Sequence, residues 1–136
     1  MNIYQDPKDL AKSHLANLIR LAKADEQIHH HEIIFIQSLA VKMGLTDFEF
    51  QAVVKDPDRI TFKVAYDEEV KLEHYFQTLT LMNIDFNAHS KEQEFCLELG
   101  KKMRIPSYHC SRMIEFMVNN VGEIISYTEF KSQIQG

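Results

Sequence analysis

The sequence predicts an all-α protein of about seven helices, arranged as two pseudo-symmetric repeats that share one core. Apolar residues recur with the helical period of about 3.6 in most segments, and part of the chain recurs sixty residues later. Placing residues 14–54 on residues 74–114 without a gap gives nine identical pairs in 41 positions. The pairs are His14/His74, Leu21/Leu81, Asp25/Asp85, His29/His89, Glu32/Glu92, Phe35/Phe95, Leu39/Leu99, Lys42/Lys102 and Met43/Met103. This recurrence indicates a duplicated helical unit.

We expect one domain, because 136 residues with 45% apolar content can bury a sizeable core. Repeat 1 is expected at about 7–55, a linker at 56–66, repeat 2 at about 67–120, and a terminal helix at about 126–135. Either repeat alone would bury too little surface to be stable, so the two repeats should pack against each other.

The first repeat begins where Asp6 can cap a helix that has Pro7 at its first position. This helix should end near residue 24. The next helix, about 30–43, is apolar over so much of its circumference that we expect it to be central. Gly44 ends it through a left-handed cap, and the capping box from Thr46 to Glu49 starts a third helix.

The segment Ile60 to Ala65 alternates in polarity but has no obvious strand partner, which favours an extended linker. Acidic residues at 67–69 then suit a helix N-terminus, and three helices should follow at about 67–85, 90–103 and 106–118. A second capping box at Ser126–Glu129 opens the terminal helix.

Composition argues against several classes of partner. The formal net charge is −5 and the pI is about 5.8, which does not suit binding to nucleic acid or to an anionic membrane. No apolar run is long enough for membrane insertion, and the first residues do not resemble a signal peptide, so we expect a cytoplasmic protein. Cys96 and Cys110 lack a metal-type spacing and should be reduced core thiols.

The most informative feature is an acidic loop that occurs twice, with an Asp at the end of one helix and a Glu seven residues later. The candidate residues are Asp25, Glu32, Asp85 and Glu92, with His29 and His89 as additional candidates. If each of these His residues is an N-cap, each Glu lies at the N3 position, where its carboxylate can accept the N-cap N–H. Ordinary helix capping is therefore one interpretation.

The other interpretation is that these carboxylates bind a divalent metal ion, because such ions prefer carboxylate oxygens. An EF-hand is excluded, since it needs Gly at the sixth and Glu at the twelfth loop position. The run His29 to His31 cannot converge on one ion while helical, because successive residues diverge by about 100°. His14 and His74 lie about 16 Å from the aspartates of their own repeats, so we expect core-edge histidines with polar partners.

A catalytic role is less well supported. The sequence has no Gly-rich phosphate loop, no HExxH motif and no nucleophile elbow. We therefore expect no enzymatic activity, with a metal-dependent hydrolase as the weaker alternative. A purely structural or protein-interaction domain, whose carboxylates only cap helices, is the main alternative to metal binding.

The segments LAKADEQIHHHE (21–32) and LAVKMGLT (39–46) resemble the tellurite-resistance TerB-like family. That family has an apolar helix ending in Ala-Asp-Gly, then x-Ile, three residues and Glu, and an apolar helix ending near Leu-Gly-Leu-Ser. The second repeat matches more loosely, and the resemblance covers roughly residues 10–118.

The resemblance implies a cytoplasmic all-α domain of two pseudo-symmetric halves that acts in stress-response assemblies through a protein partner. It also implies metal binding by the acidic loops, which carries over to Asp25, Glu32, Asp85 and Glu92. The chain departs from the family where Glu26 and Phe86 replace the Gly after Asp, and where Ala88 replaces Ile.

Overall fold

The computed structural model describes residues 4–24, 28–84 and 90–135, and these residues form seven α-helices, one short 3₁₀ helix and no strand. The elements are α1 (Pro7–Ala22), α2 (His30–Lys42), α3 (Asp47–Lys55), η1 (Pro57–Arg59), α4 (Glu68–Met82), α5 (Ser90–Lys102), α6 (Ser107–Val118) and α7 (Tyr127–Gln135). The predicted all-α class is confirmed. In the described ranges, no helix has the length and apolar character needed to cross a membrane.

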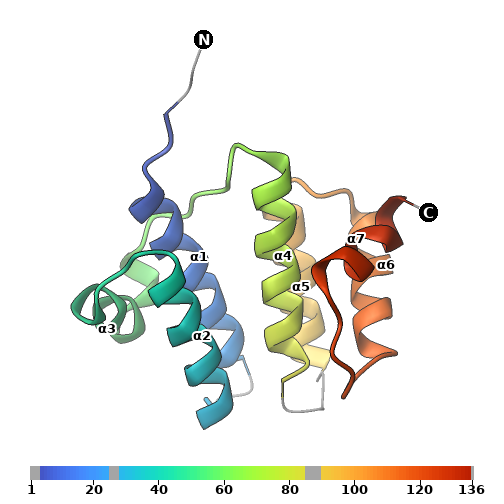
Figure 1. Ribbon diagram of the computed structural model, residues 1–136, viewed down its shortest axis with the longest axis horizontal. Coiled ribbons are helices and arrows are strands. Elements are labelled where there is room, and N and C mark those ends of the chain that lie inside the picture. Colours follow the sequence, from blue (N-terminus) through green and yellow to red (C-terminus); the bar gives the residue numbers. More distant parts are fainter. Residues whose placement is uncertain (1–3, 25–27, 85–89, 136) are drawn as a thin grey trace.

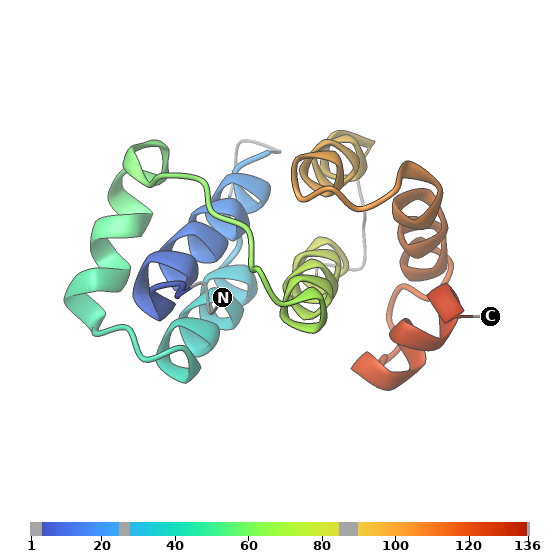
Figure 2. The same cartoon turned by 90° about the horizontal axis from the view of Figure 1, so that it is seen from above.

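The core lies where the two sets of helices meet. Helices α1, α2 and α3 make up one side of the molecule, and α4 to α7 make up the other (Figures 1 and 2). Helix α1 packs against α2 and α3 on its own side and against α4 and α5 across the middle. Its residues Leu15, Leu18 and Ile19 are fully buried. The bounds of α5 are those of α2 shifted by sixty residues at both ends.

The prediction that the second helix is central was wrong. In α2, the buried apolar residues are Ile36, Leu39 and Ala40, whereas Ile34 is 48% exposed and Val41 is 70% exposed. A helix with apolar residues on all its faces can be buried by several neighbours, but its sequence does not determine which neighbours pack against it. Helix α1 takes the central position in the first half because it contacts helices of both halves.

Two helix starts follow the predicted capping chemistry. The Asp6 carboxylate accepts the backbone N–H groups of Lys8 at 2.9 Å and Asp9 at 3.3 Å. At the start of α3, Thr46 Oγ1 accepts the N–H of Glu49 at 3.1 Å, and Glu49 Oε1 accepts the N–H of Thr46 at 2.9 Å. These contacts satisfy N–H groups that have no partner inside the helix.

The extended segment between η1 and α4 is held by side chains instead of by a strand. The Ser13 hydroxyl accepts the N–H of Lys63 at 2.7 Å and donates to its carbonyl oxygen at 3.0 Å. Gln5 donates to the carbonyl of Val64 at 2.7 Å and accepts the N–H of Tyr66 at 3.0 Å. The first helix and the residues before it therefore fix the segment that joins the two halves.

Helices α2 and α5 end in the same way, with a left-handed residue just beyond the helix. Gly44 has φ 82° and Arg104 has φ 62°. The next residue, Leu45 or Ile105, donates its N–H back to the helix at 3.0 or 2.9 Å. The predicted glycine cap is confirmed, but in the second half an arginine holds a conformation that costs a residue with a Cβ about 1 kcal/mol or more.

Replacing Arg104 by Gly should raise the free energy of unfolding by up to about 1 kcal/mol. The relief of backbone strain is partly offset because Gly is more flexible in the unfolded chain. The reverse change, Gly44→Arg, should lower the free energy of unfolding by about 1 kcal/mol, because a Cβ at Gly44 would have open space around it and only the backbone is strained. Urea denaturation of both variants measures the two effects. A marked loss of stability in Arg104→Gly would show that contacts of its side chain outweigh the strain.

Candidate functional site

The helix ends that flank the two acidic loops in sequence lie at one end of the molecule. The C-terminal ends of α1 and α4 and the N-terminal ends of α2 and α5 all lie at the lower end in Figure 1. Among the candidate ligands, Asp25, Asp85 and His89 lie outside the described residues. The structure therefore places Glu32, Glu92 and His29, and these three residues are the part of the predicted site that can be described.

Both glutamates are buried in the first turn of their helices. Glu32 is the third residue of α2 and Glu92 is the third residue of α5, and each is 6% exposed. His29 is the N-cap of α2, with extended backbone and no side-chain capping hydrogen bond. The predicted N3 position is thus confirmed for Glu32.

Two other glutamates of this chain, Glu49 and Glu129, occupy the same N3 position and can be compared with Glu32 and Glu92. Glu49 is the third residue of α3 and forms a complete capping box, yet its side chain is 20% exposed. Glu129 is the third residue of α7, its N–H is donated to Ser126 Oγ at 3.1 Å, and it is exposed. A capping position therefore does not by itself bury a carboxylate. Burial of Glu32 and Glu92 carries a desolvation cost that hydrogen-bond donors or cations have to offset.

No group of three or more His, Cys, Asp or Glu side chains within the described ranges is arranged to hold a metal ion. His29, His30 and His31 are exposed, and the rings of the last two are 6.3 Å apart and tilted by 55°. These three histidines thus lie on the exposed start of α2. A ligand set at this end of the molecule would have to include residues of the two acidic loops themselves.

The histidines that recur sixty residues apart meet each other across the contact between α1 and α4. The rings of His14 and His74 are stacked, with centroids 4.0 Å apart and planes within 5°. They are 4% and 7% exposed. His14 Nε2 donates to Gln77 Oε1 at 2.7 Å. We predicted a polar partner for each but not the stacking, although two equivalent positions on two helices that pack together are a signal for such a contact.

Burial keeps this histidine pair neutral. It lowers the pKa of His14 from 6.5 to about 3, together with repulsion from His74 and against the opposing effect of the Gln77 hydrogen bond. Burial lowers the pKa of His74 from 6.5 to about 4. At neutral pH both imidazole rings are therefore uncharged, and neither carries the extra proton that a histidine acting as a general acid would give up.

The two thiols are part of the core, as predicted. Cys96 and Cys110 are fully buried and unbridged. Burial raises the pKa of Cys96, and the nearby Glu92 charge raises it further. Burial also raises the pKa of Cys110. Neither sulfur is a thiolate at neutral pH, so neither has the form that attacks substrates or binds metals.

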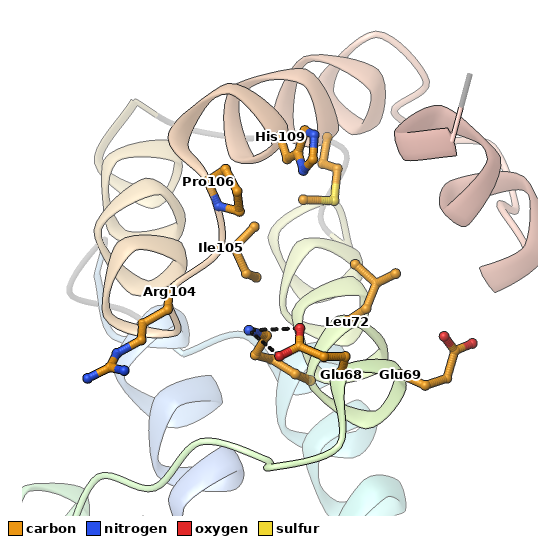
Figure 3. Close-up of a pocket in the computed structure, with 9 residues that line it drawn as sticks. Glu68, Glu69, Leu72, Arg104, Ile105, Pro106 and His109 are labelled. Carbon is orange, nitrogen blue, oxygen red and sulfur yellow. Dashed lines mark hydrogen bonds and ion pairs between the residues drawn. The ribbon is translucent and has the colours of Figure 1, made fainter.

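A small pocket of about 230 Å³ lies between α4 and α6, at the N-terminal end of α4 (Figure 3). Its apolar lining includes Leu72, Ile105 and Pro106. Lys71 Nζ forms an ion pair with the Glu68 carboxylate at 3.0 Å at the edge of this pocket. Figure 1 places the N-terminal end of α4 opposite the N-terminal ends of α2 and α5, so the pocket is separate from Glu32 and Glu92.

Comparison with known proteins does not assign the chain to a family. No family model matches it, and neither does any curated protein or solved structure that was searched. The resemblance to the TerB-like family therefore stays a prediction from the sequence.

Proposed function

We propose that this protein is a non-enzymatic, cytoplasmic TerB-like module that binds a divalent metal ion through its duplicated acidic loops and acts in a stress response through a protein partner. The proposed ligands are Asp25, Glu32, Asp85 and Glu92, with His29 and His89 as additional ligands. Carboxylate oxygens favour hard cations such as Ca²⁺, Mg²⁺ or Mn²⁺, whereas participation of imidazole would shift the preference towards Mn²⁺ or Zn²⁺.

The observation that supports metal binding best is the burial of Glu32 and Glu92. Each is buried, whereas Glu49, which caps a helix from the same N3 position, is only partly buried. A cation held between carboxylates offsets the cost of removing them from water. Repetition of the same buried Glu at the start of α2 and α5, at one end of the molecule, fits one composite site or two equivalent ones.

The proposal of a protein partner is supported by large apolar side chains on the outer helices of the first half. Val41 of α2 is 70% exposed and Phe48 of α3 is 84% exposed, and these two helices pack together. Apolar side chains of this size are commonly covered in complexes.

Thermal unfolding with EDTA, and then with Ca²⁺, Mg²⁺, Mn²⁺ or Zn²⁺ in its place, tests metal binding. An ion that binds only the folded state, at 100 times its Kd, raises the free energy of unfolding by about 2.7 kcal/mol. For a domain of this size we expect Tm to rise by roughly 10 °C with the preferred ion. The rise should disappear in Asp25→Asn/Asp85→Asn and shrink in Glu32→Gln/Glu92→Gln.

Glu49→Gln is the matched control, because it changes a capping glutamate at the N3 position of another helix. This variant should lose some stability but keep the full response to the ion. If no ion raises Tm, or if the aspartate variant responds as strongly as the unmodified protein, metal binding is wrong. The carboxylates would then be structural, which is the second candidate function and fits the N3 position of Glu32.

A further inference from the structure

A second pocket, of about 490 Å³, is lined by several positively charged side chains. These residues do not form a basic motif in the sequence, and the chain as a whole is acidic. The pocket lies between the segment joining the two halves, the first turns of α4 and the end of α5. Its charged lining residues are Lys63, Lys71, Lys102, Arg104 and Glu68. Four cations thus face one carboxylate, in a protein whose formal net charge is −5. We call these five residues and their surroundings the basic pocket.

Three of the four cations have no carboxylate partner in the part of the chain that the structure describes. Among the described residues, Lys63, Lys102 and Arg104 form no ion pair. The Lys102 ammonium instead lies 5.9 Å from the centre of the Phe62 ring. Figure 3 shows the Arg104 side chain directed away from both Glu68 and His109. These positive groups are therefore available to an anion that enters the basic pocket.

The fourth cation is buried with weak compensation. The Lys71 side chain is 11% exposed, but its partner Glu68 is 82% exposed and lies only three residues away on the same helix. An ion pair with one fully hydrated partner contributes little, whereas removing an ammonium from water is costly. An anionic ligand next to Lys71 would complete the compensation that Glu68 provides only in part.

Arg104 adds a second, independent observation. It holds a left-handed backbone, with φ 62°, at the position where the first half of the chain has Gly44. The fold needs a left-handed residue here to end α5, but glycine would supply it without strain, as Gly44 does at the end of α2. Among the described residues, the Arg104 side chain forms no ion pair that would repay the strain. Such outliers concentrate at binding sites, where the side chain has a task outside the fold.

The size and the aromatic lining of the pocket indicate what kind of anion fits. A volume of about 490 Å³ lies in the range of small-molecule sites and is far larger than a free phosphate ion needs. Phe62 is 36% exposed and Tyr66 is 61% exposed, and both line the pocket. Their rings offer apolar surface to an organic group beside the cations.

We propose that the basic pocket binds a small organic phosphate with at least two negative charges, with the phosphate on Lys71, Lys102 and Arg104 and the organic part on Phe62 and Tyr66. Phosphate groups suit Arg and Lys through charge-assisted hydrogen bonds. This proposal is independent of the metal-binding proposal, because the basic pocket is at the opposite end of the molecule from the helix starts that carry Glu32 and Glu92.

Isothermal titration calorimetry in EDTA at low salt tests the proposal with four probes: ADP, inorganic pyrophosphate, inorganic phosphate and adenosine. We expect the affinity to fall in that order, with no measurable binding of adenosine. Raising the salt concentration should weaken the binding of ADP, because the attraction is largely between exposed charges. If ADP saturates the protein and pyrophosphate does not, the proposal stands, and the aromatic rings contribute more of the binding free energy than the phosphate contacts alone.

Lys102→Gln and Arg104→Gly should each weaken ADP binding by about tenfold or more, which is the usual effect of losing one charge-assisted hydrogen bond. Arg104→Gly is informative because it is expected to keep or raise stability, so a loss of affinity cannot come from unfolding. Lys42→Gln is the matched control, since Lys42 is the equivalent residue at the end of α2, and it should bind ADP normally.

Three results would overturn the proposal. They are absence of binding by ADP and pyrophosphate at millimolar concentration, unchanged affinity in both Lys102→Gln and Arg104→Gly, and adenosine binding as tight as that of ADP. Glu32→Gln/Glu92→Gln should leave ADP binding intact, so failure of the metal proposal and failure of this proposal give different patterns.

Discussion

Lowering the pH from about 7 to about 5 is expected to reduce the free energy of unfolding by about 2–4 kcal/mol. The cause is the buried pair of His14 and His74, whose pKa values are lowered to about 3 and about 4. Below pH 6.5 the unfolded chain binds protons on both rings, while the folded protein does not. Stability is therefore complete above pH 6.5 and falls as the pH decreases, by about 1.4 kcal/mol per pH unit for each histidine.

The range from pH 7 to pH 5 distinguishes the titration of the histidines from that of the carboxyl groups. Hydrogen bonds from the Thr46 backbone and from Lys8 lower the pKa of Glu49 to about 2, and a hydrogen bond from Lys131 lowers the pKa of Glu69. Groups with a depressed carboxyl pKa lose their contribution only below about pH 4.5, where the unfolded carboxyl begins to bind protons. A decrease between pH 7 and pH 5 thus reports on histidine.

Urea denaturation at a series of pH values measures this dependence. His74→Phe keeps a ring stacked on His14 but removes one titrating group, so the decrease should be about halved. His31→Gln changes an exposed histidine and should leave the pH dependence as it is. A stability that stays flat from pH 7 to pH 5, or an unchanged dependence in His74→Phe, would contradict the role of the stacked pair.

Gly100→Ala is expected to lower the free energy of unfolding by about 1–3 kcal/mol, although Ala is the better helix former. A Cβ at Gly100 would overlap the sulfur of Cys110 and lie 3.0 Å from the Tyr75 hydroxyl oxygen. Tyr75 and Cys110 are fully buried, and the Tyr75 hydroxyl donates to the Cys96 carbonyl at 2.8 Å. Neither neighbour can move away without loss of packing or of that hydrogen bond.

A double variant distinguishes this overlap from other effects. In Gly100→Ala/Cys110→Ala the sulfur is absent, so the double variant should be more stable than the sum of the single effects predicts. Ala40→Gly in α2 is the matched control. Ala40 is the equivalent residue and is buried, and its replacement should cost about 1 kcal/mol through helix propensity. Stabilisation by Gly100→Ala alone would show that the junction of α4, α5 and α6 is looser than these distances imply.

Most of the helices could be predicted because their starts and stops are local. Asp6, Thr46 and Gly44 act on backbone groups within four residues of themselves, so the sequence pattern around each residue is sufficient. The central position of α1 could not be predicted in this way. Both α1 and α2 carry enough apolar residues for a core, and the choice between them depends on contacts with α4 and α5, which are distant in sequence.

For the candidate metal site, the structure tests only where the described residues lie in their helices. The N3 position of Glu32 follows from local spacing and is confirmed, but its burial does not follow from spacing, because Glu49 occupies the same position in α3 and is more exposed. What covers a side chain depends on neighbouring elements. Metal binding by any of the six candidate residues, Asp25, Glu32, Asp85, Glu92, His29 and His89, stays a prediction.

By itself, the sequence determined the helical class, the caps of the helices, the recurrence after sixty residues and the core character of the thiols, because these depend on short-range periodicity and composition. Only the tertiary structure decided that His14 stacks on His74, that Gly100 has to be small, and that Lys71, Lys102 and Arg104 line one pocket. In each case the residues come from helices or segments that are far apart in the chain. Their meeting is decided by how these helices pack against one another, and a local pattern carries no information about that packing.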